Sequence, residues 1–403
     1  MTSPSPYHGL YAYAWDVAPE EPDRFVGELQ QWSIDTLCLA ASYHAGKFIR
    51  PHASGSRVFF PEDGTVHCAT RPERYGAIKP RPSSAVADDV FGRYAARADI
   101  RVTAWTVLLH NTPLGTAHPD CVARNAFGDP YWYSLCPANP DVQDYAVALC
   151  ADIADRYPLR GLVLETPGWL PYAHGYHHEF ALIGSNSWLD ANLGLCFCPS
   201  CLAGAASSGI DAEGLRRRVA AGIDGYLRAS RDTPADIGQC WIQADLVADP
   251  DLAPFLRWRQ SVVTALVQRI RAAVRRDAEL FVIPSVRRPS ASGWLEGSDL
   301  PALAAAADGL EICFYEPSWQ RAAADFGEVR RRVGADAAIR CVLRPAPPDS
   351  QEEGEFARTV AELDRESAAG FAFYNYGHVR RANLDWIGRA LGGRLSKGHD
   401  HAS

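Results

Sequence analysis

The chain has 403 residues, of which 47% are hydrophobic and 22% charged, a composition typical of globular proteins. Its formal net charge of -8 and its isoelectric point near 5.8 argue against a nucleic-acid partner, which would require a basic surface. No apolar run reaches the roughly 18 residues of a membrane-spanning helix, so we expect no membrane partner.

The N-terminal residues and the cysteines indicate a cytoplasmic protein. Residues 1–6 lack the basic-then-apolar pattern of a secretory signal. The count of 11 cysteines is odd, which fits a reducing compartment better than a framework of disulfides. The sequence leaves the oligomeric state open, with a homo-oligomer as one alternative.

Eight apolar segments rich in β-branched or aromatic residues predict eight strands, at residues 9–15, 34–41, 100–107, 159–164, 280–285, 310–315, 339–343 and 370–375. Helical patterns separate them, most clearly at residues 140–156, 252–275, 302–307 and 355–368. Alternating helices and continuously apolar strands predict an α/β fold, a parallel (β/α)8 TIM barrel. A doubly wound open sheet is the alternative, but no glycine-rich phosphate turn follows the first strand.

Two long segments interrupt this alternation, residues 45–85 after the second strand and residues 166–250 after the fourth. The second contains a predicted helix at residues 212–229. Both follow the carboxyl end of a strand, the face where barrel enzymes place their active sites. We therefore expect residues 1–394 to form one barrel domain with two long loops, and residues 395–403 to be a disordered tail.

Carboxyl groups at the predicted strand ends are the candidates for catalysis. Glu165 follows the fourth strand and Glu316 follows the sixth, and two such groups could act as acid and base across a glycosidic bond. Each could instead be a salt-bridge partner of Arg287 or Arg344. Further candidates for the second carboxyl are Asp16 and, on the long loop, Asp245.

The same predicted rim is rich in aromatic residues. Aromatic faces bind the apolar side of a sugar ring, while polar neighbours bind its hydroxyl groups. The segment 167–179 contains Trp169, Tyr172, His174, His177 and His178, and we predict that it is a substrate-binding loop. The other candidates for carbohydrate binding are Asp16, His44, Asn111, Arg287, Arg344, Tyr374 and Asn375.

The histidines of this loop also permit a different chemistry. His174, His177, His178 and Glu179 could bind a catalytic metal ion with an open coordination position. No two of these histidines are four residues apart, however, which is the helical spacing of the zinc-protease motif. Carbohydrate binding is therefore the favoured interpretation of the loop.

Three cysteines lie close together in the second long segment. Cys196, Cys198 and Cys201 have C-x-C-x-x-C spacing around Pro199, which brings three thiolates within reach of one ion. The alternative is three unrelated core cysteines, because free cysteine is often buried. We predict a zinc site, which requires a fourth ligand from elsewhere in the chain.

The cysteine motif, the run at residues 133–140 and the segment 161–165 together resemble glycoside hydrolase family 42. In those β-galactosidases, four cysteines that include a C-x-C-x-x-C motif hold a structural zinc ion. The resemblance, which spans residues 130–320, implies that Cys136 is the fourth ligand here. It also implies a (β/α)8 barrel with its active site at the strand ends.

The chain departs from this family at both catalytic positions. Where the family has an Asn-Glu pair after strand four, this chain has Leu164-Glu165, and where it has a nucleophilic Glu after strand seven, this chain has Leu343-Arg344. We therefore expect a rebuilt site that cleaves a small glycoside or oligosaccharide. Glu165 would be the general acid, and Glu316 the base or nucleophile.

The two arginines at the rim, Arg287 and Arg344, could bind an anionic group on the sugar, because guanidinium groups match carboxylates and sulfates bidentately. Two alternatives remain from the sequence. One is a carbohydrate-binding barrel that has lost the nucleophile of the family. The other is a zinc-dependent hydrolase that uses the histidine-rich loop.

Overall fold

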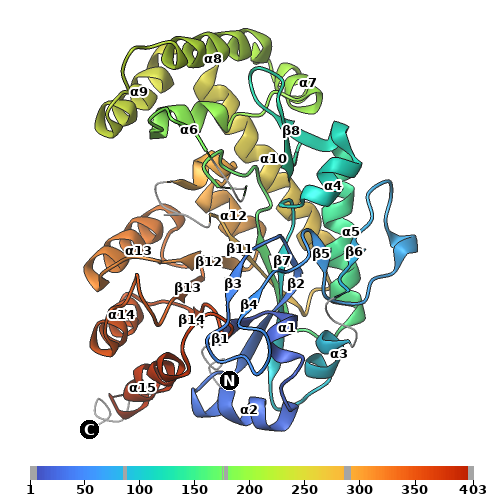
Figure 1. Ribbon diagram of the computed structural model, residues 1–403, viewed down its shortest axis with the longest axis vertical. Helices are drawn as coiled ribbons and strands as arrows, with labels where there is room; N and C mark the ends of the chain where they lie inside the picture. The colour runs from blue at the N-terminus through green and yellow to red at the C-terminus, as the bar shows by residue number, and fades with distance from the viewer. Residues whose placement is uncertain (1–6, 85–88, 175, 177–179, 286–291, 398–403) are drawn as a thin grey trace.

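Eight parallel strands close into a barrel, which confirms the predicted (β/α)8 fold (Figure 1). The computed structural model describes residues 7–84, 89–174, 176, 180–285 and 292–397. Each strand pairs in parallel with its neighbours, and pairing of β1 with both β14 and β2 closes the ring. The barrel strands are β1 (Tyr7–Ala12), β2 (Thr36–Tyr43), β7 (Arg101–Val107), β10 (Gly161–Glu165), β11 (Glu279–Ile283), β12 (Gly309–Cys313), β13 (Ile339–Leu343) and β14 (Gly370–Phe373).

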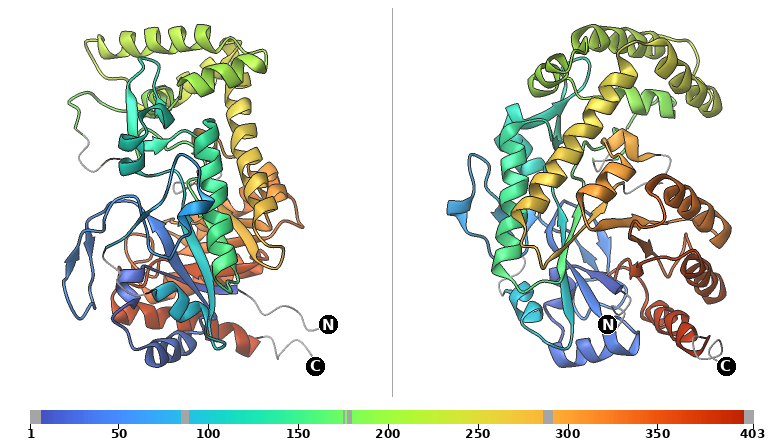
Figure 2. Two further views of the ribbon diagram at one scale, coloured as in Figure 1. Left: turned by 90° about the vertical axis from the view of Figure 1, so that its right-hand side faces the viewer. Right: turned by 180° about the vertical axis from the view of Figure 1, so that it is seen from behind.

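Helices cover the outside of the barrel (Figure 2). The four clearest predicted helices are all present, as α5 (Pro140–Arg156), α10 (Leu252–Ala273), α12 (Leu300–Ala306) and α14 (Glu353–Arg365). Helix α5 begins where the sequence indicates, because the Asn139 side chain accepts hydrogen bonds from two backbone N–H groups and Pro140 fits the first turn. The other helices of the barrel are α1 (Ala14–Val17), α2 (Pro22–Gln31), α3 (Val90–Ala95), α4 (Thr112–Ala117), α13 (Trp319–Val333) and α15 (Arg381–Lys397).

The ends of some strands differ from the prediction. The first strand ends at Ala12 instead of residue 15, because the chain turns into α1 at Ala14. The fifth ends at Ile283, where Pro284 has no N–H to continue the ladder. These differences are confined to the last few residues of each predicted strand.

Both predicted long loops follow strands of the barrel. The first contains β3 (Phe48–Ile49), β4 (Val58–Phe59), β5 (Thr65–Val66) and β6 (Arg81–Pro82). The second contains α6 (Ser187–Leu193), α7 (Pro199–Ser207), α8 (Ala212–Leu227) and α9 (Ala235–Ala248), which lie at the end of the molecule opposite α2 and α15 (Figure 1). A further excursion after β7 forms the hairpin of β8 (Val122–Arg124) and β9 (Pro130–Leu135).

The C-terminal segment is more ordered than predicted. Helix α15 continues to Lys397, so the first three residues of the expected disordered tail are helical. The helix is held by its buried apolar face, which includes Leu384, Ile387 and Leu391. Residues 398–403 lie outside the described residues.

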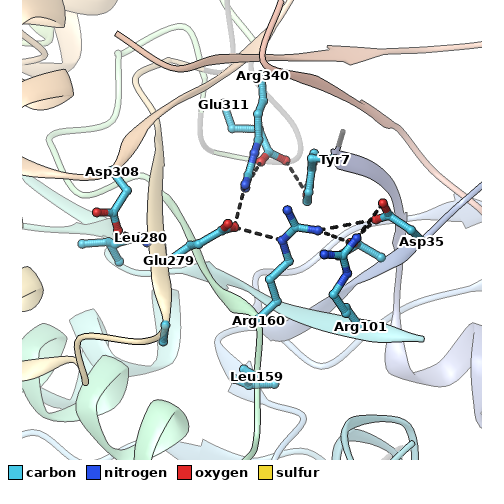
Figure 3. A network of polar contacts seen from close by, with 12 residues as sticks. Tyr7, Asp35, Arg101, Leu159, Arg160, Glu279, Leu280, Asp308, Glu311 and Arg340 are labelled. Carbon is cyan, nitrogen blue, oxygen red and sulfur yellow. Dashed lines mark hydrogen bonds and ion pairs between the residues drawn. The ribbon is translucent and has the colours of Figure 1, made fainter. Parts of the chain in front are cut away.

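The interior of the barrel changes character from its amino end to its carboxyl end. Side chains point inward at every second residue of a strand. At the amino end a network of ion pairs crosses the barrel (Figure 3): Glu279 accepts from Arg340 at 2.6 Å and from Arg160 at 3.0 Å. Glu311 lies beside it, with its carboxylate 3.7 Å from Arg340. Above this network the interior is aromatic and apolar, and it opens into a pocket.

None of the helices in the described part of the chain combines the length and the hydrophobicity needed to span a bilayer.

Candidate functional site

A pocket of about 240 Å³ opens at the carboxyl end of the barrel, where the active sites of TIM-barrel enzymes lie. The side chains that line it come from all eight strands or their carboxyl ends, and from the second long loop. They are Tyr11, Tyr43, His44, Trp105, Glu165, His174, Ile283, Cys313, Tyr315, Val342, Arg344 and Tyr374. The lining is mainly aromatic, and Glu165 supplies its one carboxyl group among the described residues.

Glu165 is held at the floor of this pocket. It is the last residue of β10, and its Oε2 accepts a hydrogen bond from Nε1 of Trp105 at 2.5 Å. Burial raises the pKa of Glu165 to about 7, because the hydrogen bond from Trp105 only partly offsets the loss of water. The carboxyl group is therefore poised to give or take a proton near neutral pH, as a general acid or base must.

Two tyrosines of the lining, Tyr43 and Tyr374, pack against a third, the fully buried Tyr13. The hydroxyl groups of Tyr13 and Tyr374 lie 2.8 Å apart, and the ring of Tyr43 packs edge-on against Tyr13. Burial raises the pKa of each of these hydroxyls, so all three stay neutral and can donate as well as accept hydrogen bonds. Neutral hydroxyls beside Glu165 suit the recognition of a polyhydroxylated ligand.

Arg344 reaches the pocket but is already paired. Its Nη2 donates to Asp349 Oδ1 at 2.6 Å, and its Nε donates to the other carboxylate oxygen. The guanidinium also lies 4.1 Å above the ring of Tyr315. Because Asp349 neutralises its charge, Arg344 is less available to an anionic ligand than the sequence alone suggests.

Two of the predicted histidines line the pocket. The ring of His44 stacks on His110 with 4.0 Å between centroids, and His174 lies 6.2 Å from His110. Both His44 and His174 are pocket residues. The segment that contains Tyr172 and His174 therefore does approach Glu165, while His177 and His178 lie outside the described residues.

The predicted second carboxyl, Glu316, does not line the pocket. Its Oε2 accepts from Nε of Arg321 at 2.7 Å, which makes it a salt-bridge partner of that residue. Asp16 is likewise engaged, with Oδ1 2.6 Å from Nε of Arg50. Asp245 accepts from the indole of Trp188 on the distal helices. The structure thus brings one predicted catalytic carboxyl into the pocket, and three stay outside.

Several residues predicted to bind carbohydrate have structural contacts instead. Asn111 caps α4 through the N–H of Leu114. Trp169 is buried, with the guanidinium of Arg259 4.5 Å above its ring. Asn375 accepts from the N–H of Gly377. Arg287 lies outside the described residues.

The sequence does not single out Tyr11 or Cys313 as pocket residues, and it favours a place in the core for Trp105. All three lie within strands that are apolar on both faces, so their sequence pattern does not distinguish inward from outward positions. Alternation along β7 could have predicted that Trp105 points inward. It lies two residues after Thr103 and two before Val107, on the inward face of the strand. An indole inside a barrel needs a partner for its N–H, and Glu165 is that partner.

Four cysteines meet beside the barrel, at the start of the second long loop. Cys136, Cys196, Cys198 and Cys201 are all buried, and their sulfur atoms lie within 4.8 Å of one another. Sγ of Cys136 is 3.5 Å from Cys198 and from Cys201, and 3.9 Å from Cys196. Tetrahedral coordination at about 2.3 Å would separate the sulfurs by about 3.8 Å, so the four residues could bind a metal ion.

A buried arginine beside the cysteines supports this interpretation. Arg259 is 1% exposed, has no ion pair with a described carboxylate, and donates to the carbonyl of Leu295 at 3.0 Å. Burial lowers the pKa of Arg259, whereas charge on the neighbouring sulfurs raises it. Four thiolates around a divalent ion carry two negative charges, which would compensate this cation. No other group of His, Cys, Asp and Glu in the described residues converges in this way.

Comparison with known proteins shows similarity in fold. No protein-family model matches the sequence, and no curated protein matches it either. Among solved structures, the glycoside hydrolase domain of PgaB (BpsB) from Bordetella bronchiseptica aligns with a TM-score of 0.55 and 16% identity, over 97% of this chain and 98% of that one. A β-galactosidase from the psychrophilic Marinomonas ef1 aligns with a TM-score of 0.56 and 10% identity, over 98% of this chain and 60% of that one.

An α-L-fucosidase, isoenzyme 2 from Paenibacillus thiaminolyticus, aligns with a TM-score of 0.54 and 12% identity, over 99% of this chain. The chain spans only 51% of that fucosidase. The structural neighbours are thus TIM barrels of glycoside hydrolases, which agrees with the glycoside hydrolase-like barrel predicted from the sequence. At these identities the comparison establishes the fold, and the chemistry must be argued from the pocket.

Proposed function

We propose that the protein is a glycoside hydrolase-like enzyme in which Glu165 is the general acid. The observation that carries the proposal is the position of this carboxyl, buried at the carboxyl end of β10 with a pKa raised to about 7. A general acid must hold its proton at working pH and release it to the leaving-group oxygen. Burial, with no ion pair to a cation in the described part of the chain, gives Glu165 this property.

The rest of the lining favours a sugar as the substrate. Aromatic rings face the pocket from β1, β7 and the ends of β2, β12 and β14, and tyrosine hydroxyls are interspersed with them. This mixture matches the apolar face and the hydroxyl groups of a pyranose ring. The pocket volume of about 240 Å³ is at the small end of the range for ligand sites and fits a single ring.

Glu165 is proposed as the general acid, and no base or nucleophile is assigned. Glu316 is not carried into it as base or nucleophile, because Arg321 engages its carboxylate outside the pocket. With one carboxyl in the described lining, a barrel that binds carbohydrate without cleaving it is the second candidate function.

A panel of p-nitrophenyl glycosides tests the proposal. We expect release of p-nitrophenol from at least one monosaccharide glycoside, and loss of that release in Glu165→Gln. Binding of sugars by calorimetry without release from any member of the panel would favour the binding barrel. Undiminished turnover in Glu165→Gln, on the phenyl glycoside of the same sugar as well, would remove Glu165 from the mechanism.

We also propose that the four cysteines hold a structural zinc ion. Support comes from the spacing of the sulfurs, their burial and the uncompensated charge of Arg259. We expect one zinc per chain by elemental analysis, and a loss of both zinc and thermal stability in Cys198→Ser/Cys201→Ser. Cys240 is exposed and outside the cluster, so Cys240→Ser is the matched control and should change neither quantity.

A reducing compartment is part of the same proposal. All 11 cysteines are free thiols, and a zinc site built from thiolates survives best where disulfides do not form. We therefore propose a cytoplasmic location.

A further inference from the structure

Aromatic side chains continue outward from the pocket in an unbroken row. The ring of His44, at the pocket, stacks on His110 with 4.0 Å between centroids. His110 lies 6.0 Å from Tyr133, and Tyr133 lies 5.8 Å from Tyr131, with their ring planes 12° apart. The row therefore leads from the second strand of the barrel onto the β8–β9 hairpin.

Two further tyrosines flank the outer part of this row. Tyr172 lies 6.0 Å from Tyr131, and Tyr176 lies 6.0 Å from Tyr133. Both belong to the loop after β10, and they are 38% and 58% exposed. We name Tyr131, Tyr133, Tyr172 and Tyr176 the outer aromatic cluster. It presents ring surface to solvent next to a pocket that holds a single sugar ring.

Hydrogen bonds fix the parts of the molecule that carry this cluster. The hydroxyl of Tyr131 donates to the carbonyl of Leu193 at 2.8 Å. The backbone N–H of Ala173, beside Tyr172, donates to Asp190 Oδ1 at 2.6 Å. Ordering the hairpin and the segment at Tyr172 would cost a ligand little, since these hydrogen bonds are made before binding.

We propose that the outer aromatic cluster binds sugar units beyond the one in the pocket, so that the substrate is a carbohydrate chain and not a small glycoside. This inference rests on the proposed function, because it takes the pocket as the place where the bond is cleaved. Stacking on aromatic faces tolerates different hydroxyl patterns, which suits the repeating units of an oligosaccharide.

Strand β9 also provides a control residue, which tests whether any exposed aromatic side chain would bind the carbohydrate. Trp132 lies between Tyr131 and Tyr133 on β9 and is 40% exposed. Because alternate residues of a strand face opposite sides, Trp132 points away from the cluster. Its removal should leave binding of the chain unchanged.

The test measures binding in the Glu165→Gln background, where cleavage is blocked. Calorimetry compares disaccharides with hexasaccharides from three series: β-linked glucose, galactose and N-acetylglucosamine oligomers. We expect at least one hexasaccharide to bind about tenfold more tightly than its disaccharide. Tyr172→Ala/Tyr176→Ala should abolish that difference, and Trp132→Ala should retain it, with melting curves confirming that both variants fold.

Equal affinity for the two chain lengths in every series, or no binding of any hexasaccharide, would overturn the inference. So would an equal loss of affinity in Trp132→Ala. The failure of the proposed function is a separate result: undiminished turnover of p-nitrophenyl and phenyl glycosides in Glu165→Gln removes the catalytic role, while length-dependent binding would still support the outer aromatic cluster.

Discussion

Two glutamates at opposite ends of the barrel, Glu279 and Glu165, have opposite surroundings. At the amino end, burial alone would raise the pKa of Glu279, but Arg340 and Arg160 outweigh it and the pKa is lowered. At the carboxyl end, Glu165 has an indole N–H as its neighbour and no ion pair with a cation among the described residues, and its pKa is raised to about 7. Both the exposure and the available positive charge differ, because the Glu279 side chain is 37% exposed and paired with two arginines, whereas Glu165 is buried.

This difference in surroundings indicates that the amino end of the barrel contributes stability and the carboxyl end contributes the chemistry. Arg340 is sandwiched between the rings of Tyr7 and Phe281, with its guanidinium 3.7 and 3.5 Å from their centroids. Such a packed and paired network fixes the ends of the strands, as expected for the amino face of a TIM barrel. An unpaired carboxyl costs stability, and it persists where a proton has to move.

The largest effect is expected at the carboxyl end, from Glu165→Gln. The amide retains the shape of the side chain but cannot donate the catalytic proton, so kcat should fall about 100- to 10,000-fold. Thermal stability should stay the same or rise, because an amide is buried more cheaply than a carboxylate. Steady-state kinetics and calorimetric melting measure the two effects, and a large loss of stability would assign Glu165 a structural role instead.

The corresponding substitution at the amino end of the barrel is Arg340→Met. It leaves Glu279 and Glu311 without their shared cation, and removing one partner of a buried ion pair costs about 3 kcal/mol or more. We expect a lower urea midpoint with kcat nearly unchanged for the fraction that is folded. If Arg340→Met were stable but inactive, the network at the amino end would be required for catalysis at the carboxyl end, and the two ends would not be independent.

The pH dependence sharpens the same comparison. An exposed glutamate titrates near 4.3, whereas Glu165 in the folded chain has a pKa of about 7. The folded state therefore binds the extra proton between these values, and stability falls as the pH rises from about 4.3 through 7. Activity that needs the protonated acid should fall above about pH 7.

The Glu165→Gln variant separates the contribution of Glu165 to the pH dependence of stability from the contributions of the other titrating groups. The difference in unfolding free energy between wild type and variant should change across this pH window and be flat outside it. A difference that is constant from pH 4 to pH 8 would show that the pKa of Glu165 is not raised.

The smallest effect is expected from Glu316→Gln. Its partner Arg321 is half exposed, so loss of this ion pair should cost about 1 kcal/mol or less. We expect kcat within a few-fold of wild type, measured on the same glycoside as for Glu165→Gln. A loss as large as that of Glu165→Gln would restore the sequence-based role of Glu316 as base or nucleophile.

Much of the fold follows from periodicity that the sequence displays. The eight apolar segments correspond to the eight barrel strands, because continuous apolar runs separated by helical patterns have few other solutions. Glu165 was also predictable, as the polar residue that ends an apolar strand. The spacing of Cys196, Cys198 and Cys201 indicated a ligand cluster, and the family resemblance supplied Cys136.

The pocket lining was harder to predict, because it depends on contacts distant in sequence. The pairing of Arg344 with Asp349 depends on the loop after β13. Asn111 shows a signal that was misread: Asn-Thr-Pro before a helix is a capping pattern, and the side chain does cap α4. Glu316 lies two residues before Ser318, the N-cap of α13, so Arg321, in the first turn of that helix, lies within reach of it.

The central claim, that Glu165 protonates the leaving group, is tested most directly by varying that group. Glycosides with good leaving groups, such as 2,4-dinitrophenyl, need little protonation, whereas phenyl glycosides need it fully. We predict that Glu165→Gln retains most of its activity on a dinitrophenyl glycoside and loses about 100-fold or more on the phenyl glycoside of the same sugar. An equal loss on both substrates would contradict the account.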